Sequence, residues 1–217
     1  MKTIRVTGSG SASAPVDHVV LRFDVAAQEM DYEEAVNALN EQVAQLRRDV
    51  EIAGAPLDEM KTTSFSVDAQ HHWDSDDKES VFYGYRASHN LTLGFGWDQD
   101  LLNALLRQIA AGGSCADLNI MFTVSDQDAL QRMALADAVH SARTRAEILA
   151  EAAGVKLGDL QSIEHAWSEV RFSHSPIAYS MEEAAGAPMA SVEPEDIDAS
   201  DTATLVWEIR AERARAL

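Results

Sequence analysis

Few of the reactive side chains in this 217-residue chain have the spacing that a catalytic or metal site needs. Adjacent His71 and His72, with Asp68 nearby, could offer ligands to a metal ion. Neighbouring residues on a strand point to opposite faces, so only one of the two imidazoles would reach a given ion. A solvated end of a hairpin explains this cluster better, and we expect neither a transition metal nor a cofactor.

Two other motifs resemble reactive sites only in outline. Gly8-Ser9-Gly10 follows a strand, but no third glycine opens a helix and no lysine follows, so a phosphate-binding loop is not indicated. Cys115 is the sole cysteine, which excludes an intramolecular disulfide, and its Gly-rich turn favours a small, partly buried thiol over a nucleophile. No Gly-x-Ser-x-Gly elbow occurs. The sequence therefore predicts no catalytic residues and no enzymatic activity.

The charge of the chain restricts its partners. Asp and Glu outnumber Lys and Arg by 36 to 17, which gives a formal net charge of −19. Such a field repels phosphate backbones and anionic lipid surfaces, so neither nucleic acid nor membrane is an expected partner. The sequence has no signal-peptide-like start and no long apolar run, which predicts a cytoplasmic protein.

A repeated unit dominates the chain. The two copies cover about residues 18–67 and 117–167, with Phe23 equivalent to Phe122 and Gly54 to Gly154. Each copy has the pattern strand, helix, strand. We predict a single α+β domain over residues 1–217, with duplicated units, both helices on one face of a mainly antiparallel sheet, and a long projecting hairpin.

Helix signals are clear at three places. Asp31 and Asp98 are expected to cap helices, and a third helix is expected from about residue 128 to residue 153. Gly54 and Gly154 have the character of left-handed residues at helix ends. The third helix has an alanine at every fourth position from residue 134 to residue 150, which favours close packing on a sheet over a helix–helix contact between subunits.

The strands are predicted from alternation of apolar and polar residues. A first strand from Ile4 should be broken at residues 8–11. Other strands are expected at about residues 18–28, 118–124, 160–167 and 202–209. Residues 174–200 contain many acids and several prolines but no cation, which predicts a mobile loop. The basic tail after Arg210 should be frayed.

Two long strands, Met60–Trp73 and Val81–Phe95, are expected to form a hairpin with an acidic tip at residues 74–80. Four aromatic residues gather along it: Trp73, Phe82, Tyr83 and Tyr85. They could be cross-strand pairs of a half-buried ribbon, or an oligomer contact if the ribbon projects.

Several segments, in their order and spacing, resemble the SIMPL-domain family, long classed as a domain of unknown function. The segments are Val6–Gly10, Pro15 with Asp17, Lys61–Val67, Gly84–Leu93, Ala142–Ala150 and Gly154–Gly158. The resemblance implies an α+β fold without known catalytic residues or cofactor. It also implies relatives that are often exported, linked to stress tolerance and ring-like assembly, and, in animals, associated with a signalling kinase.

The favoured function is a non-enzymatic scaffold that self-assembles or binds another protein, with a stress-related role implied by the resemblance. A homo-oligomer is therefore expected. The alternatives are a module that holds a small ligand between sheet and helices, and an enzyme whose site is dispersed along the sequence.

Overall fold

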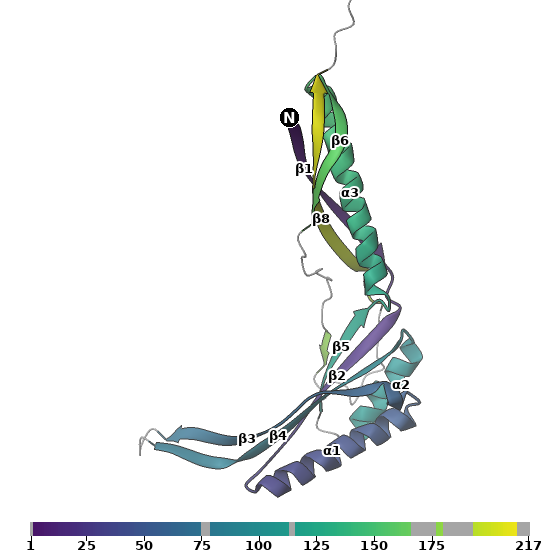
Figure 1. Ribbon diagram of the computed structural model, residues 1–217. Coiled ribbons are helices and arrows are strands. Elements are labelled where there is room, and N and C mark those ends of the chain that lie inside the picture. The colour runs from purple at the N-terminus through teal and green to yellow at the C-terminus, as the bar shows by residue number, and fades with distance from the viewer. Residues whose placement is uncertain (1, 75–78, 113–115, 166–176, 180–192, 212–217) are drawn as a thin grey trace, which may run out of the picture. The chain divides into compact units, whose positions relative to one another are not determined.

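The computed structural model describes residues 2–74, 79–112, 116–165, 177–179 and 193–211. Within these ranges the chain forms three α-helices and two antiparallel sheets, which confirms the α+β class (Figure 1). The chain divides into two compact units. Unit 1 consists of Met1–Pro15, Val124–Ser173 and Glu195–Leu217, and unit 2 of Val16–Thr123 and His174–Pro194. The single domain over residues 1–217 stays a prediction.

Unit 2 is built on a five-stranded sheet with the strand order β3-β4-β2-β5-β7. Its strands are β2 (His18–Glu29), β3 (Met60–Asp74), β4 (Glu79–Gly96), β5 (Ala116–Thr123) and β7 (Ile177–Tyr179). Alternate residues of β2, such as Leu21 and Phe23, are fully buried. They pack with α1 (Tyr32–Ile52) and α2 (Gln99–Gly112) in one core. Both helices that the structure describes in unit 2 therefore lie on the same face of this sheet.

The helices of unit 2 begin where the sequence predicts. The Asp31 carboxylate accepts hydrogen bonds from the backbone N–H groups of Glu33 and Glu34, at 2.8 and 3.3 Å. Asp98 accepts from the N–H groups of Asp100 and Leu101 in the same way. Each aspartate thus satisfies N–H groups that have no partner inside the helix, which fixes the first residue of α1 and α2.

Unit 1 is a three-stranded sheet with the order β1-β8-β6, covered on one face by α3 (Gln127–Ala152). Its strands are β1 (Thr3–Ala14), β6 (Val155–Glu164) and β8 (Ile197–Ala211). The alanine stripe is buried against the sheet, as predicted, and joins Val6, Leu205 and Trp207 in a second core.

The predicted break of the first strand at residues 8–11 is wrong, because β1 continues through both glycines to Ala14. A Cβ atom on Gly8 would lie 2.8 Å from the Ala142 Cβ and still closer to backbone atoms of Ala138 and Ala142. Gly10 meets the next turn of α3, near Ala134 and Ala138, in the same manner. The glycines are therefore required by close contact with the helix, not by a turn.

Three other boundaries differ from the prediction. β6 begins at Val155, directly after the end of α3, instead of near residue 160. Its antiparallel pairing with β8 contains two register shifts. β8 begins at Ile197 and pairs with β1 from Ile197 to Glu208, so residues 197–200 are not part of a loop. Residues 177–179 form β7 on β5. The remaining parts of the predicted loop, residues 174–176 and 180–192, the tail beyond residue 211 and Cys115 lie outside the described residues.

The two repeats follow the predicted order of elements, and Gly54 and Gly154 both have positive φ, at 83° and 67°. The expected placement of both helices on one face of a single sheet is wrong, because α1 packs on the five-stranded sheet and α3 on the three-stranded sheet. The first repeat, β2-α1-β3, lies within the five-stranded sheet, whereas the second begins in that sheet with β5 and ends in the other with β6. The two opening strands pair directly with each other, Phe23 facing Leu118.

Candidate functional site

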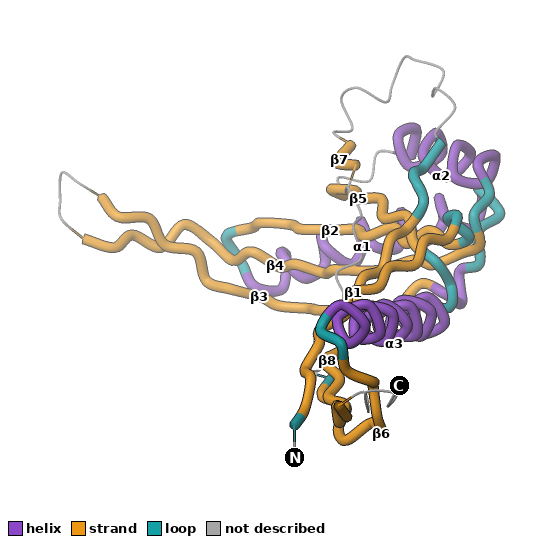
Figure 2. Tube along the Cα trace, turned by 90° about the horizontal axis from the view of Figure 1, so that it is seen from above, coloured by secondary structure: helices purple, strands orange, loops and turns teal. Residues whose placement is uncertain are grey.

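The hairpin β3–β4 is longer than the sheet that supports it. β2 pairs with β4 only as far as Tyr85, while β3 and β4 continue to pair up to Asp74 and Glu79. The two strands therefore leave the sheet as a two-stranded ribbon (Figure 2). This confirms the predicted long hairpin; its tip, residues 75–78, is outside the described ranges.

A β-bulge decides how the aromatic residues of the ribbon are arranged. Gln70 pairs with Gly84 and His71 with Phe82, so β4 has one extra residue between these pairs. Gly84 has a φ of 129°, and a Cβ there would lie 2.6 Å from the Glu29 carbonyl oxygen. Only glycine meets both demands, which is the usual reason for a glycine at a bulge.

The bulge separates the four predicted contact residues. Phe82 and Tyr85 lie in edge-to-face contact with ring centroids 5.2 Å apart, although they are three positions apart in sequence. Tyr85 also contacts Tyr32 at the start of α1 and packs against the core. Tyr83 instead lies against His72, at 5.6 Å. Trp73 is 65% exposed.

β3 is an edge strand over its whole length, since it ends the order β3-β4-β2-β5-β7 among the described strands. Nearly all of its residues are exposed, including Phe65. From Thr62 to Trp73 the strand has one acidic residue, Asp68, and no lysine, arginine, glycine or proline. Natural sheets protect edges with charges, prolines or short strands, and β3 has little of this protection.

The histidine pair behaves as its strand position predicts. His71 contacts Phe82, and His72 contacts Tyr83, at centroid distances of 5.5 and 5.6 Å. Across the described parts of the chain, no group of three or more His, Cys, Asp or Glu side chains is arranged to hold a metal ion. The absence of a cofactor stays a prediction.

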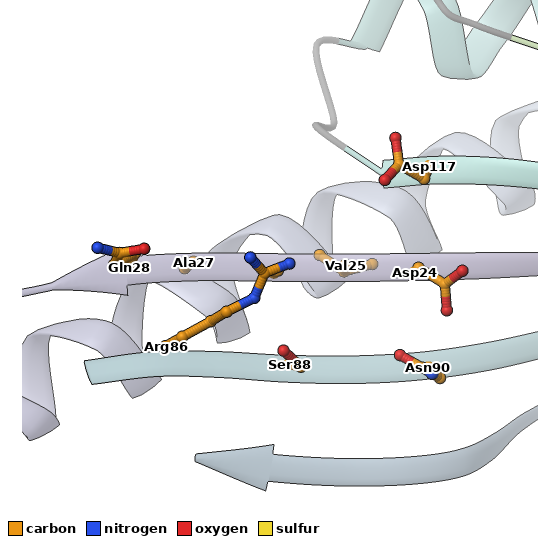
Figure 3. Close-up of a pocket in the computed structure, with 9 residues that line it drawn as sticks. Asp24, Val25, Ala27, Gln28, Arg86, Ser88, Asn90 and Asp117 are labelled. Carbon is orange, nitrogen blue, oxygen red and sulfur yellow. The ribbon is translucent and has the colours of Figure 1, made fainter. Parts of the chain in front are cut away.

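A polar hollow of about 500 Å³ lies on the face of the five-stranded sheet opposite α1 and α2 (Figure 3). Its polar lining residues come from three strands: Asp24 and Gln28 on β2, Arg86, Ser88 and Asn90 on β4, and Asp117 on β5. It differs from the alternative considered above, a ligand held between sheet and helices. Sequence reasoning missed it, because the only signal was polar alternation on strands whose pairing was unknown.

Two buried polar groups were also missed. Asp201 in β8 is almost fully buried, and both of its carboxylate oxygens lie 3.1 Å from His165 Nε2. The Thr202 N–H donates to the same carboxylate. In unit 2, Asp49 is buried between α1 and α2, where one oxygen accepts from Gln45 and Gln108.

One histidine of unit 2 has a perturbed pKa. His89 lies on the core face of β4, with Nε2 2.9 Å from the Thr62 hydroxyl and its ring edge-to-face with Phe65. Burial disfavours the charged imidazolium, and the positive charge of Arg47 adds to this effect. Together they lower the pKa of His89 below its ordinary value of 6.5.

Comparison with known protein families identifies a match over most of the chain. The model of the SIMPL family, described as a protein of unknown function (DUF541), matches residues 4–207 and so spans both units. The chain belongs to the SIMPL family. A search of curated proteins finds no significant match. In the described part of this SIMPL protein, no helix is both long enough and apolar enough to cross a membrane.

Family membership by itself assigns no activity, because the SIMPL family is described as one of unknown function. The surfaces described above therefore carry the functional argument.

Proposed function

We propose that this SIMPL protein is a non-enzymatic scaffold that assembles with copies of itself through the β3–β4 hairpin. The observation that carries the proposal is the β3 edge, a long, exposed and almost uncharged strand beside exposed aromatic side chains. An edge of this kind offers a row of backbone N–H and C=O groups to a further strand.

The distribution of charge supports a second copy of this chain as the partner. The whole chain carries a net charge of −19, so two copies repel each other at long range. The stretch from Thr62 to Trp73 contributes only one acid, and two such edges can approach with little local repulsion. Antiparallel pairing of two β3 strands is self-complementary, which is the requirement of a two-fold interface.

The aromatic side chains add apolar area to this contact. Trp73, Phe82 and Tyr83 are exposed on the ribbon, and a two-stranded ribbon is at best marginally stable in water without further cover. Aromatic residues are enriched at interfaces because they bury large areas with few rotatable bonds. Tyr85 has a different role, since it already packs on Tyr32 and the core.

The test is the molar mass in solution, measured by size exclusion with light scattering at micromolar concentration. The unaltered protein should be at least a dimer, more so at moderate than at low salt, because salt screens the repulsion between acidic copies. The double variant Trp73→Ser/Tyr83→Ser and the edge variant Ser66→Lys should each shift the mass towards that of a monomer.

Met133→Ser is the matched control, because Met133 is also an exposed apolar residue (60%) but lies on α3. It should leave the mass unchanged. A monomer at both salt concentrations would refute the proposal, and so would an oligomer that survives both hairpin variants.

A further inference from the structure

The polar hollow on the five-stranded sheet owes its shape to small residues between larger ones. Ala26 and Ser88 face each other in register and form its floor. Larger polar side chains stand two positions along the strands on either side: Arg86 facing Gln28, and Asn90 facing Asp24. Residues two apart on one face are separated by about 7 Å, so the hollow is walled at both ends.

The two ends carry opposite charge. At one end Asp24 faces Asp117 across the β2–β5 pair, and two carboxylates directly opposite each other repel. At the other end the Arg86 side chain reaches from β4 over β2 (Figure 3). Among the described residues, Arg86 forms no ion pair with these carboxylates or with Asp68, its neighbour on β3.

We propose that this hollow binds a free amino acid or a short peptide, with the ligand's carboxylate on Arg86 and its ammonium group between Asp24 and Asp117. The volume of about 500 Å³ lies in the range of small-ligand sites. A planar guanidinium binds carboxylates through paired hydrogen bonds. An ammonium group donates three hydrogen bonds and relieves the repulsion between the two aspartates.

A zwitterion fits this arrangement better than a simple ion. A lone cation would leave the guanidinium unused, and a lone anion at Arg86 would face the carboxylates across the hollow. Ser88 lies between the charged ends and Asn90 stands at the acidic end opposite Asp24, and both can exchange hydrogen bonds with a peptide group. The separation of the ligand's charges therefore decides which member of the class binds best.

Calorimetric titration at low salt tests this with glycine, glycylglycine and triglycine, in which the charge separation grows stepwise. One of the three should bind best. Blocking its amine by acetylation, or its carboxylate by amidation, should weaken binding by about tenfold or more, because each removes a charge-assisted contact. No detectable binding by any of the three, or equal binding of the blocked forms, would overturn the proposal.

Two variants identify the ends. Arg86→Gln should remove the preference for a free carboxylate and keep the preference for a free amine, whereas Asp117→Asn should do the reverse. Arg22→Gln is the matched control, an arginine on the same face of β2 that does not line the hollow. It should keep both preferences, and loss of carboxylate preference in Arg22→Gln alone would contradict the assignment of Arg86. The hairpin variant Trp73→Ser/Tyr83→Ser should still bind, which separates this test from that of self-assembly.

Discussion

Replacing Gly8 by alanine should destabilise unit 1 more than a single added methyl group usually does. The new Cβ would lie 2.8 Å from the Ala142 Cβ and closer still to the Ala138 carbonyl oxygen and the Ala142 amide nitrogen. Ordinary contacts of a Cβ begin at 3.4 Å, so α3 would have to withdraw by more than about 0.6 Å. The obstructing atoms belong to the helix backbone and cannot rotate away.

The expected cost follows from that withdrawal. A gap of about 0.5–1 Å forfeits a quarter to a half of each dispersion contact across it, and the alanine stripe of α3 lies along this interface. Overpacking of a core costs about 1–3 kcal/mol. Because rigid backbone blocks the methyl group, we expect about 3 kcal/mol for Gly8→Ala, with a similar loss for Gly10→Ala.

Urea unfolding followed by circular dichroism and by the fluorescence of buried Trp207 measures this loss. The double variant Gly8→Ala/Gly10→Ala should lose less than the two single losses added, because both glycines contact Ala138 and one displacement of α3 relieves both clashes. Adding Ala142→Gly to Gly8→Ala should not restore stability, since the Ala138 carbonyl oxygen remains in the way.

Two controls separate the clash from a general effect of alanine in strands. A Cβ on Gly96 would lie 3.9 Å from its nearest neighbour, the Asp17 carbonyl oxygen, so Gly96→Ala should be neutral or slightly stabilising. Ser9→Ala changes an exposed residue between the two glycines and should stay within about 0.5 kcal/mol. A loss below about 0.5 kcal/mol in Gly8→Ala, or strict additivity in the double variant, would refute the reasoning.

Two further predictions concern histidines. His165→Phe removes a hydrogen-bond donor from the buried Asp201 carboxylate and should lower the free energy of unfolding in urea by about 1–3 kcal/mol. The double variant His165→Phe/Asp201→Asn should recover part of this loss, because it removes the unpaired buried charge. An unchanged free energy of unfolding in His165→Phe, or no recovery in the double variant, would contradict the prediction. His89 has a pKa lowered by burial and by Arg47, so below its ordinary pKa of 6.5 the unfolded chain binds more protons than the folded one. The contribution of His89 to the free energy of unfolding is therefore constant above that pH and declines as the pH falls below it. His89→Gln should make the free energy of unfolding depend less on pH in this range. An equal slope of the free energy against pH in both proteins would contradict this prediction.

Local sequence signals determined most of the elements of this protein. Asp31 and Asp98 marked two helix starts, Gly54 and Gly154 marked two helix ends, and apolar alternation revealed most strands. The hairpin and its four aromatic residues were also predicted. These features rest on residues a few positions apart, and their physical causes, capping, left-handed backbone and one-sided burial, act within a single element.

The tertiary structure decided what depends on which segments become neighbours. Gly8 predicted a break in a strand, but it lies inside β1 and is required by contact with α3, about 130 residues away in the sequence. The second repeat is divided between two sheets because β5 pairs with β2 while β6 pairs with β8, and the pairing of β5 with β2 brings Asp117 opposite Asp24. Asp201 and His165 likewise meet only because β6 lies beside β8. The periodicity of apolar residues indicates which face of an element is buried but not which element packs against it. The polar hollow on the five-stranded sheet and the buried Asp201–His165 pair therefore follow only from the tertiary structure.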